Sequence, residues 1–230
     1  MKKIGFIGAY DKTDMLLNLA KILTTMNNRV LVVDSTINQK AKYVVPAINP
    51  TVSYITSFED IDVAVGFERT EHIKEYIGID GELPYDILLI DCDAAKRIEE
   101  FQLEKADKNY FVTSFDIYSL KKGIEILSAL KAPIKLTKIL YAKEVLKEED
   151  DYLNFLSLGC KILWEDERIY FPIENGDLSV ISENQRVKKI KFKRLSIQYK
   201  DSLGFIAQQI LGQNKDSYIR RVIKTIERGV

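Results

Sequence analysis

The residues of this sequence that could do chemistry stand at the ends of short apolar runs. The segment Gly-Ala-Tyr-Asp-Lys-Thr, residues 8–13, follows the first run and precedes a helical pattern, and two later runs each end in an aspartate. A lysine and a hydroxyl at a helix start can hold a phosphate and its Mg²⁺, while an aspartate nearby holds the metal's water ligands. The pattern predicts a phosphate-binding site formed by Gly8, Asp11, Lys12, Thr13 and Asp34. Once a nucleotide is bound, the metal ligands would be Thr13 and Asp91.

The elements that must position these residues alternate along the chain. Apolar runs ended by polar residues predict strands at 3–7, 29–34, 85–91, 108–113 and 134–141, with weaker strands at 52–56 and 61–65 and short extended pieces at 161–164 and 169–171. Helical spacing of apolar residues predicts helices at 14–26, 68–76, 95–104, 117–131, 144–158 and 202–211. The stretch 185–192 fits either type. This alternation predicts an α/β fold with a mostly parallel central sheet flanked by helices on both faces.

Length and composition limit the class of protein. A chain of 230 residues with 46% hydrophobic and 30% charged residues is typical of a globular domain. The formal net charge is zero, which excludes a strongly basic nucleic-acid binder at the level of the whole chain. The first apolar run ends at Ala9, too early for a signal peptide, so we expect a cytoplasmic location. We expect one α/β domain over 1–212, followed by a spacer and a C-terminal helix over 213–230.

The order and spacing of these segments resemble the ParA/MinD family of P-loop ATPases. Lys12 precedes Asp34 by 22 residues, a spacing that this family shows between its loop lysine and its second-strand aspartate. Residues 85–91 resemble the family's Walker B strand, and residues 106–120 resemble its A-D-x-h-h-h-V-T segment and following helix. The resemblance covers nearly the whole chain and implies a P-loop NTPase-like fold with ATP and Mg²⁺ as cofactors.

The loop departs from the family's pattern K-G-G-x-G-K-[ST]. Read back from Lys12, the first lysine of that pattern falls on Ile7, and two of its glycines fall on Ala9 and Asp11. A phosphate cradle needs consecutive backbone N–H groups around the anion, with glycines that allow close approach. Thr36 stands in the place of the family's second aspartate, which serves water activation. These departures argue against ATP, Mg²⁺ and hydrolysis.

The resemblance and the departures together predict a spatial organiser rather than an enzyme. As in the TadZ-like pilus localisation proteins of this family, the chain would position or recruit a membrane-associated machine (a pilus, secretion or division apparatus), with ATP hydrolysis weak or lost. The alternative is a slow Mg²⁺-dependent ATPase in DNA partitioning. Each site residue also has a purely structural interpretation. Lys12 and Thr13 would then be the solvated first turn of a helix, and Asp34 and Asp91 would cap backbone N–H groups.

A basic stretch lies between Val187 and Leu195. If it were a strand, every second lysine would lie on one face, where the lysines would protect a sheet edge or bind DNA phosphates or acidic lipid. DNA binding is the less favoured of these interpretations. The residues are Lys188, Lys189, Lys191, Lys193 and Arg194.

The end of the chain has the pattern of an amphipathic basic helix. Four apolar residues recur at the spacing of one helical face, and cations lie elsewhere around the helix. This tail resembles the membrane-targeting tail of MinD, so we expect residues 217–230 to form a helix that contacts an anionic membrane or a protein partner. The protein would then be peripheral on the inner face of the cell membrane, with a second copy of the chain as a further partner. The alternative is a helix docked on its own domain. The contact residues would be Ile219, Val222, Ile223, Ile226, Arg220, Arg221 and Lys224.

Overall fold

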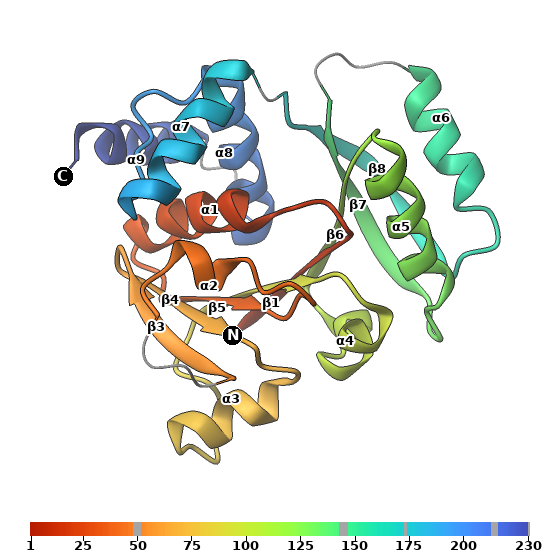
Figure 1. The fold of residues 1–230 in the computed structure, drawn as a ribbon, viewed down its shortest axis with the longest axis horizontal. Helices are drawn as coiled ribbons and strands as arrows, with labels where there is room; N and C mark the ends of the chain where they lie inside the picture. The colour runs from red at the N-terminus through yellow and green to blue at the C-terminus, as the bar shows by residue number, and fades with distance from the viewer. Residues whose placement is uncertain (48–51, 143–146, 173, 213–215, 230) are drawn as a thin grey trace.

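The computed structural model describes residues 1–47, 52–142, 147–172, 174–212 and 216–229. Within them one eight-stranded sheet has the order β3-β4-β2-β5-β1-β6-β7-β8, and every neighbouring pair except β3–β4 is parallel (Figure 1). The predicted α/β fold with a mostly parallel sheet is confirmed. The strands are β1 (Lys2–Ile7), β2 (Val30–Asp34), β3 (Tyr54–Phe58), β4 (Ile61–Val65), β5 (Ile87–Cys92), β6 (Lys108–Ser114), β7 (Ile134–Tyr141) and β8 (Ile162–Tyr170).

The helices cover both faces of the sheet and bury a separate apolar layer on each. The layer on one face is covered by α1 (Thr13–Thr25), α2 (Ala41–Val44), α7 (Asn175–Val187), α8 (Ile197–Leu211) and α9 (Asp216–Arg228). The layer on the other face is covered by α3 (Thr70–Ile77), α4 (Ala95–Glu100), α5 (Ile117–Ser128) and α6 (Lys147–Leu156). A 3₁₀ turn, η1 (Leu103–Lys105), follows α4. The central strands are therefore buried on both sides, which is why they read as continuous apolar runs.

The one antiparallel pair follows from the turn between its strands. Glu59 and Asp60 connect β3 to β4 and both adopt left-handed backbone angles, with φ of 52° and 65°. Two successive positive φ values form the kind of two-residue turn whose twist matches that of a β-hairpin. The chain therefore reverses directly here, and β3 forms one edge of the sheet.

The predicted elements match the structure closely in the first half of the chain and less well after 160. The two short pieces at 161–164 and 169–171 form one strand, β8. The start of the helix predicted at 144–158 lies outside the described residues, and the part that is described, α6, ends at Leu156. Helices α2 and α7 were not predicted.

The basic stretch is not a strand, which corrects the expectation that its alternate lysines share one strand face. It forms the connection between α7 and α8, and α7 ends where Lys188 takes a left-handed conformation with φ of 49°. Phe192 is buried and anchors the connection to the core. Arg194 and Lys191 both approach Glu183 of α7, at 2.6 Å and 3.5 Å between nitrogen and carboxylate oxygen. A role as a protected sheet edge is therefore excluded.

The C-terminal helix forms as predicted, but its apolar face is covered by the domain itself. Ile219, Val222, Ile223 and Ile226 are 2–7% exposed and belong to the core layer of α1 and α8. A methyl group at Gly204 of α8 would lie 3.3 Å from Ile219, so the glycine lets the two helices approach closely. The open alternative of a helix docked on its own domain is what the structure contains, and no free apolar face is left on α9 for a membrane or a partner. The basic residues Arg220, Arg221 and Lys224 are exposed.

None of the described helices is both long enough and apolar enough to cross a membrane.

Candidate functional site

The predicted site residues come together at the carboxyl ends of β1, β2 and β5, where parallel α/β sheets bind ligands. They surround a cavity of about 300 Å³. Asp11, Lys12, Thr13 and Asp91 all line it, as the sequence predicted, whereas Gly8 and Asp34 lie beside it. The other lining residues are Ala9, Tyr10, Thr36, Ile37, Asn38, Lys40, Asp93, Tyr118 and Lys122.

Lys12 is buried, and its ammonium group is bound entirely within the protein. The side chain is 2% exposed. Its Nζ lies 2.9 Å from a carboxylate oxygen of Asp91 and donates to the backbone oxygens of Gly8, at 2.6 Å, and Tyr10, at 3.0 Å. The ammonium group is thus enclosed by two hydrogen-bonded backbone oxygens and by the ion pair with Asp91. The interpretation of Lys12 as a solvated helix turn is therefore wrong.

The conformation of the loop explains why its carbonyl groups face the lysine. Gly8 has φ of 139°, and a Cβ atom there would lie 2.2 Å from the backbone oxygen of Val112 on β6, so only glycine fits. The chain then reaches α1 with three residues between Gly8 and Lys12, whereas the P-loop consensus has four residues and a glycine in that interval. The short path directs the backbone oxygens of Gly8 and Tyr10 toward the Lys12 ammonium.

Asp11 occupies the positive end of α1. Its carboxylate accepts hydrogen bonds from the Thr13 backbone N–H at 3.1 Å and the Thr13 hydroxyl at 2.9 Å, and it forms an ion pair with Lys40 at 3.0 Å. Burial alone would raise the pKa of Asp11, but the hydrogen bonds from Thr13 and the Lys40 charge hold that pKa below its usual value. A carboxylate at this end of a helix is stabilised by the same N–H groups and dipole that would bind a phosphate.

Asp34 acts on the backbone that follows β2. One carboxylate oxygen accepts from the Thr36 backbone N–H at 3.1 Å and the Thr36 hydroxyl at 2.6 Å, and the other accepts from the Ala41 backbone N–H at 2.9 Å. The capping interpretation of Asp34 is therefore confirmed. The Thr36 hydroxyl also accepts from the Gln39 backbone N–H at 3.0 Å, so this hydroxyl is engaged within the loop.

Asp91 at the end of β5 and Asp93 just after it are held differently from each other. Burial, with a contribution from the Asp34 charge, raises the pKa of Asp91 to about 7 although the Lys12 ammonium opposes the shift. Burial also raises the pKa of Asp93, whose carboxylate accepts from the Ile37 backbone N–H at 2.9 Å. Among the described residues no group of three His, Cys, Asp or Glu side chains is placed to hold a metal ion.

Four residues that line the cavity were not predicted from the sequence as parts of the site, namely Lys40, Asp93, Tyr118 and Lys122. The sequence contains a signal for two of them, because Lys40 follows the carboxyl end of the strand β2 and Asp93 follows that of the strand β5. Tyr118 and Lys122 lie on α5, which follows β6, the neighbour of β1 in the sheet. Only the strand order identifies that helix as a wall of the cavity.

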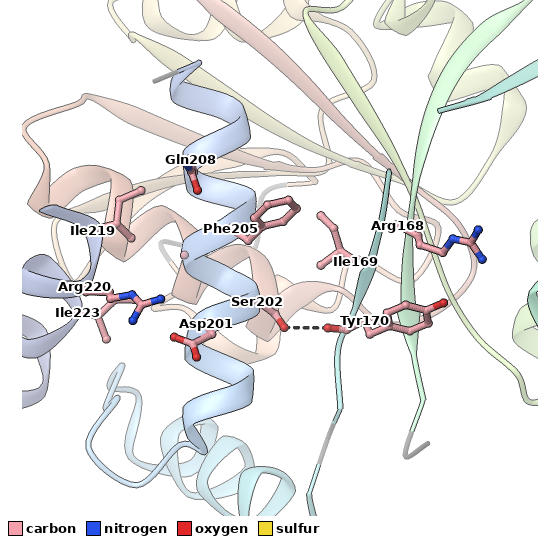
Figure 2. A pocket seen from close by; sticks show the side chains of 11 residues that line it. Arg168, Ile169, Tyr170, Asp201, Ser202, Phe205, Gln208, Ile219, Arg220 and Ile223 are labelled. Carbon is pink, nitrogen blue, oxygen red and sulfur yellow. Dashed lines mark hydrogen bonds between the residues drawn. The ribbon is translucent and has the colours of Figure 1, made fainter. Parts of the chain in front are cut away.

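A second cavity of about 370 Å³ lies between β8, α8 and α9 (Figure 2). Two of the polar groups that line it, the Ser202 hydroxyl and the Arg168 guanidinium, are already bound to other groups of the protein. The Ser202 hydroxyl donates to the Tyr170 backbone oxygen at 2.8 Å, and the Arg168 guanidinium pairs with Asp150. The cavity at the carboxyl ends of β1, β2 and β5 is therefore the better candidate for a functional site.

Comparisons with known proteins agree with this fold. No protein-family model matches the sequence, and no curated protein matches it significantly. Solved structures do match over the whole chain. A ParA-family ATPase from Chlorobium tepidum has a TM-score of 0.57 at 14% identity and covers 98% of this chain and 97% of its own.

Two further structures extend this likeness. MinD in the MinC:MinD cell division complex from Aquifex aeolicus gives a TM-score of 0.57 at 13% identity, with 93% of this chain and 97% of its own covered. An ATP complex of a McdA variant from Cyanothece gives 0.58 at 12% identity, with 92% and 96% covered. The chain therefore has the fold of the ParA/MinD-family P-loop ATPases.

Proposed function

We propose that this chain is a spatial organiser of the ParA/MinD type that has lost ATP turnover. It would position or recruit another cellular component through its surface instead of through a nucleotide cycle. The likeness to ParA, MinD and McdA structures supports the general class. Since one of these relatives is a cell division protein, we further propose a membrane-associated machine, such as a pilus, secretion or division apparatus, as the component that is positioned.

The internal use of Lys12 is the observation that carries this proposal. A triphosphate would need the Lys12 ammonium, yet that group is already engaged by the ion pair with Asp91 and by hydrogen bonds to two backbone oxygens. Breaking these contacts would leave the Asp91 carboxylate buried without its partner, which is costly. The lysine thus acts as an internal counter-ion.

The negative charge of Asp11 also argues against the binding of ATP. The positive end of α1 is occupied by a carboxylate of the chain itself, and Lys40 neutralises it. A phosphate arriving there would meet like charge, which at about 4 Å costs roughly 1–4 kcal/mol depending on solvent screening. The residues at this site consequently do not fit Mg²⁺·ATP in their present arrangement.

The alternative function, a slow ATPase, is favoured by one observation. The cavity of about 300 Å³ remains next to Lys12, Thr13 and Asp91. If the Lys12 ammonium and the Asp11 carboxylate could both be displaced, these residues would surround a phosphate.

Phosphate release and calorimetric titration with Mg²⁺·ATP distinguish the two functions. For the wild-type chain we expect no turnover above background and no binding in the micromolar range. Asp11→Gly removes the carboxylate and should not restore tight binding, because the loop is still too short. Asp201→Gly, a change of the same type on α8, is the matched control. Micromolar binding by the wild-type chain, or turnover inhibited by a non-hydrolysable ATP analogue, would establish the slow ATPase instead.

A further inference from the structure

Two segments of this neutral chain carry large and opposite charges. Residues 147–168, which include α6 and most of β8, hold seven carboxylates and three cations. Residues 183–194, from the end of α7 toward α8, hold six cations and one carboxylate. The first segment therefore has a surplus of four negative charges, although its Asp150 is buried, and the second has a surplus of five positive charges. The molecule is polarised, and a polarised surface favours contacts with a partner of opposite potential.

The acidic segment presents apolar side chains among its charges. Tyr152 and Phe155 on the outer face of α6 are 44% and 65% exposed, Leu158 in the turn after the helix is 74% exposed, and Asp151 on the helix is also exposed. The spacing of three residues between Tyr152 and Phe155 places these two on one side of the helix, and Leu158 follows two residues after its end. We call these four residues the acidic surface. Grouped exposed apolar residues of this size indicate a contact site more often than single ones do.

Contacts on the inner face of α6 attach the helix to the sheet and so fix the position of its outer face. The buried Asp150 forms an ion pair with Lys138 of β7 at 2.7 Å, and Asn154 accepts a hydrogen bond from the same ammonium at 2.5 Å. Leu153, which lies between Asp150 and Asn154 in the sequence, is fully buried. The helix is thus fixed to the sheet by one side, while the apolar residues of the other side have no apolar cover.

The basic segment has a matching composition. Leu178 on α7 and Ile197 at the start of α8 are 50% and 70% exposed. Leu178 lines a shallow hollow together with Arg186 and Arg194, and Lys193 is exposed beside Arg194. We call these five residues the basic surface. It offers apolar contacts surrounded by cations, where the acidic surface offers apolar contacts beside carboxylates.

Hydrogen bonds hold the basic surface together. The backbone N–H and the hydroxyl of Ser196 both donate to the buried Asp177 of α7, at 2.6 Å and 2.8 Å, so the starts of α7 and α8 are joined. Because Arg194 is also tied to Glu183 at 2.6 Å, the connecting loop follows the helix closely. The surface is consequently preformed, which lowers the entropic cost of binding.

We propose that the chain associates head to tail, with the acidic surface of one copy on the basic surface of the next. The two surfaces lie on opposite faces of the sheet, α6 at one end of the long axis and α7 toward the other (Figure 1). Contact between identical surfaces would oppose like charges, which disfavours a symmetric dimer through either one. A contact between different surfaces generates a ring or an open filament. This inference is independent of whether the protein binds ATP.

Complementary blocked variants of the full-length chain test the proposal by sedimentation equilibrium. The first carries Arg186→Glu and Lys193→Glu, and the second carries Asp151→Lys and Phe155→Lys. All of these side chains are exposed, so both variants should fold, as circular dichroism will verify. We expect the wild-type mass to rise with concentration at low salt and to fall as salt is added. Each variant alone should associate on the order of a hundredfold more weakly.

The mixture of the two variants decides the geometry. Each variant keeps one intact surface, so an equimolar mixture should form one-to-one dimers and nothing larger. Lys96→Glu with Lys105→Glu changes the net charge as the first variant does, on exposed residues of α4 and η1, and should associate like the wild type. A monomeric wild-type chain at low salt, blocked variants that still associate, or a mixture that stays monomeric would each overturn the proposal.

Discussion

At the scale of single residues, the main result is that a lysine in the position of a catalytic P-loop residue is a structural group. Lys12 lies in the cavity wall where the sequence pattern places it, but its ammonium neutralises Asp91 and joins two turns of the loop. The same charge that would serve a phosphate serves the fold instead. Its removal should therefore affect stability before it affects any activity.

We predict that Lys12→Met lowers the free energy of unfolding by about 3–5 kcal/mol, because Asp91 loses its ion-pair partner and must either stay charged in a buried site or bind a proton. The double variant Lys12→Met, Asp91→Leu should recover much of this loss, since an apolar pair can replace a buried ion pair. Lys21→Met is the control, because Lys21 pairs with the exposed Asp60 and should cost about 1 kcal/mol or less. Urea denaturation measures all three. Additive losses in the double variant would contradict the ion-pair explanation.

A second residue-scale prediction concerns Asp14 in the first turn of α1. Burial raises the pKa of Asp14 to about 7, although its hydrogen bond from Gln185 at 2.6 Å opposes the shift. The folded state then binds more protons than the unfolded state between about pH 4 and pH 7, so the free energy of unfolding should fall as pH rises through this window. Asp14→Asn should be nearly neutral at about pH 5 and stabilising by about 2 kcal/mol at about pH 8.

Urea denaturation at the two pH values, with Asp151→Asn on the exposed face of α6 as control, checks this expectation. Because burial also raises the pKa of Asp91 to about 7, the variant should reduce the pH dependence without abolishing it. Equal effects of Asp14→Asn at both pH values would show that Asp14 does not change its protonation in this range.

At the scale of elements, α9 shows that amphipathic spacing identifies a buried face without identifying what covers it. The spacing of Ile219, Val222, Ile223 and Ile226 predicted the helix correctly, but the cover is α1 and α8 rather than a membrane. The deciding feature is Gly204, which lets α9 come close to α8. That contact joins parts of the chain that are distant in the sequence, so no local sequence pattern predicts it.

We predict that Ile223→Ala lowers the free energy of unfolding by about 2–4 kcal/mol, as expected for a large-to-small change in a core. Lys224→Ala on the exposed face of the same helix should change it by no more than about 0.5 kcal/mol. Urea denaturation followed by circular dichroism measures both. If the two variants were equally stable, α9 would not contribute to the core in solution.

Other elements set the limit of sequence-based prediction in this protein. Buried parallel strands such as β2 and β5 were predicted because burial on both faces produces unbroken apolar runs. Helix α7 was missed because its short core contact, around Val180, is outnumbered by exposed residues on the same helix. For the site, the sequence indicated which residues meet, because the carboxyl ends of parallel strands lie at one edge. It did not indicate that Lys12 pairs with Asp91, Asp11 with Lys40 and Asp34 with the nearby backbone, since that depends on loop length and side-chain direction.

At the scale of the whole molecule, stability should be graded across the sheet. β5 and β1 lie at its centre and pair on both sides, whereas β3 and β8 are edges. We predict that backbone amides of Ile4–Phe6 and Leu88–Ile90 exchange with solvent most slowly, through global unfolding, and that those of β3 and β8 exchange through local opening. Hydrogen-exchange mass spectrometry measures this order. Edge strands as protected as β1 would indicate that a further contact, such as another copy of the chain, covers them.

The burial of Lys12 has a consequence for covalent labelling. Acylation of a lysine needs a path for the reagent to the nitrogen, and Lys12 offers none, because its side chain is 2% exposed and its ammonium is enclosed by Asp91 and two backbone oxygens. Acyl-phosphate derivatives of ATP, which transfer their acyl group to a lysine near bound phosphates, should therefore leave Lys12 unmodified. The exposed lysines would react with simple amine reagents, and the residue most similar to a nucleotide-binding lysine would be among the least accessible to reagent in the protein.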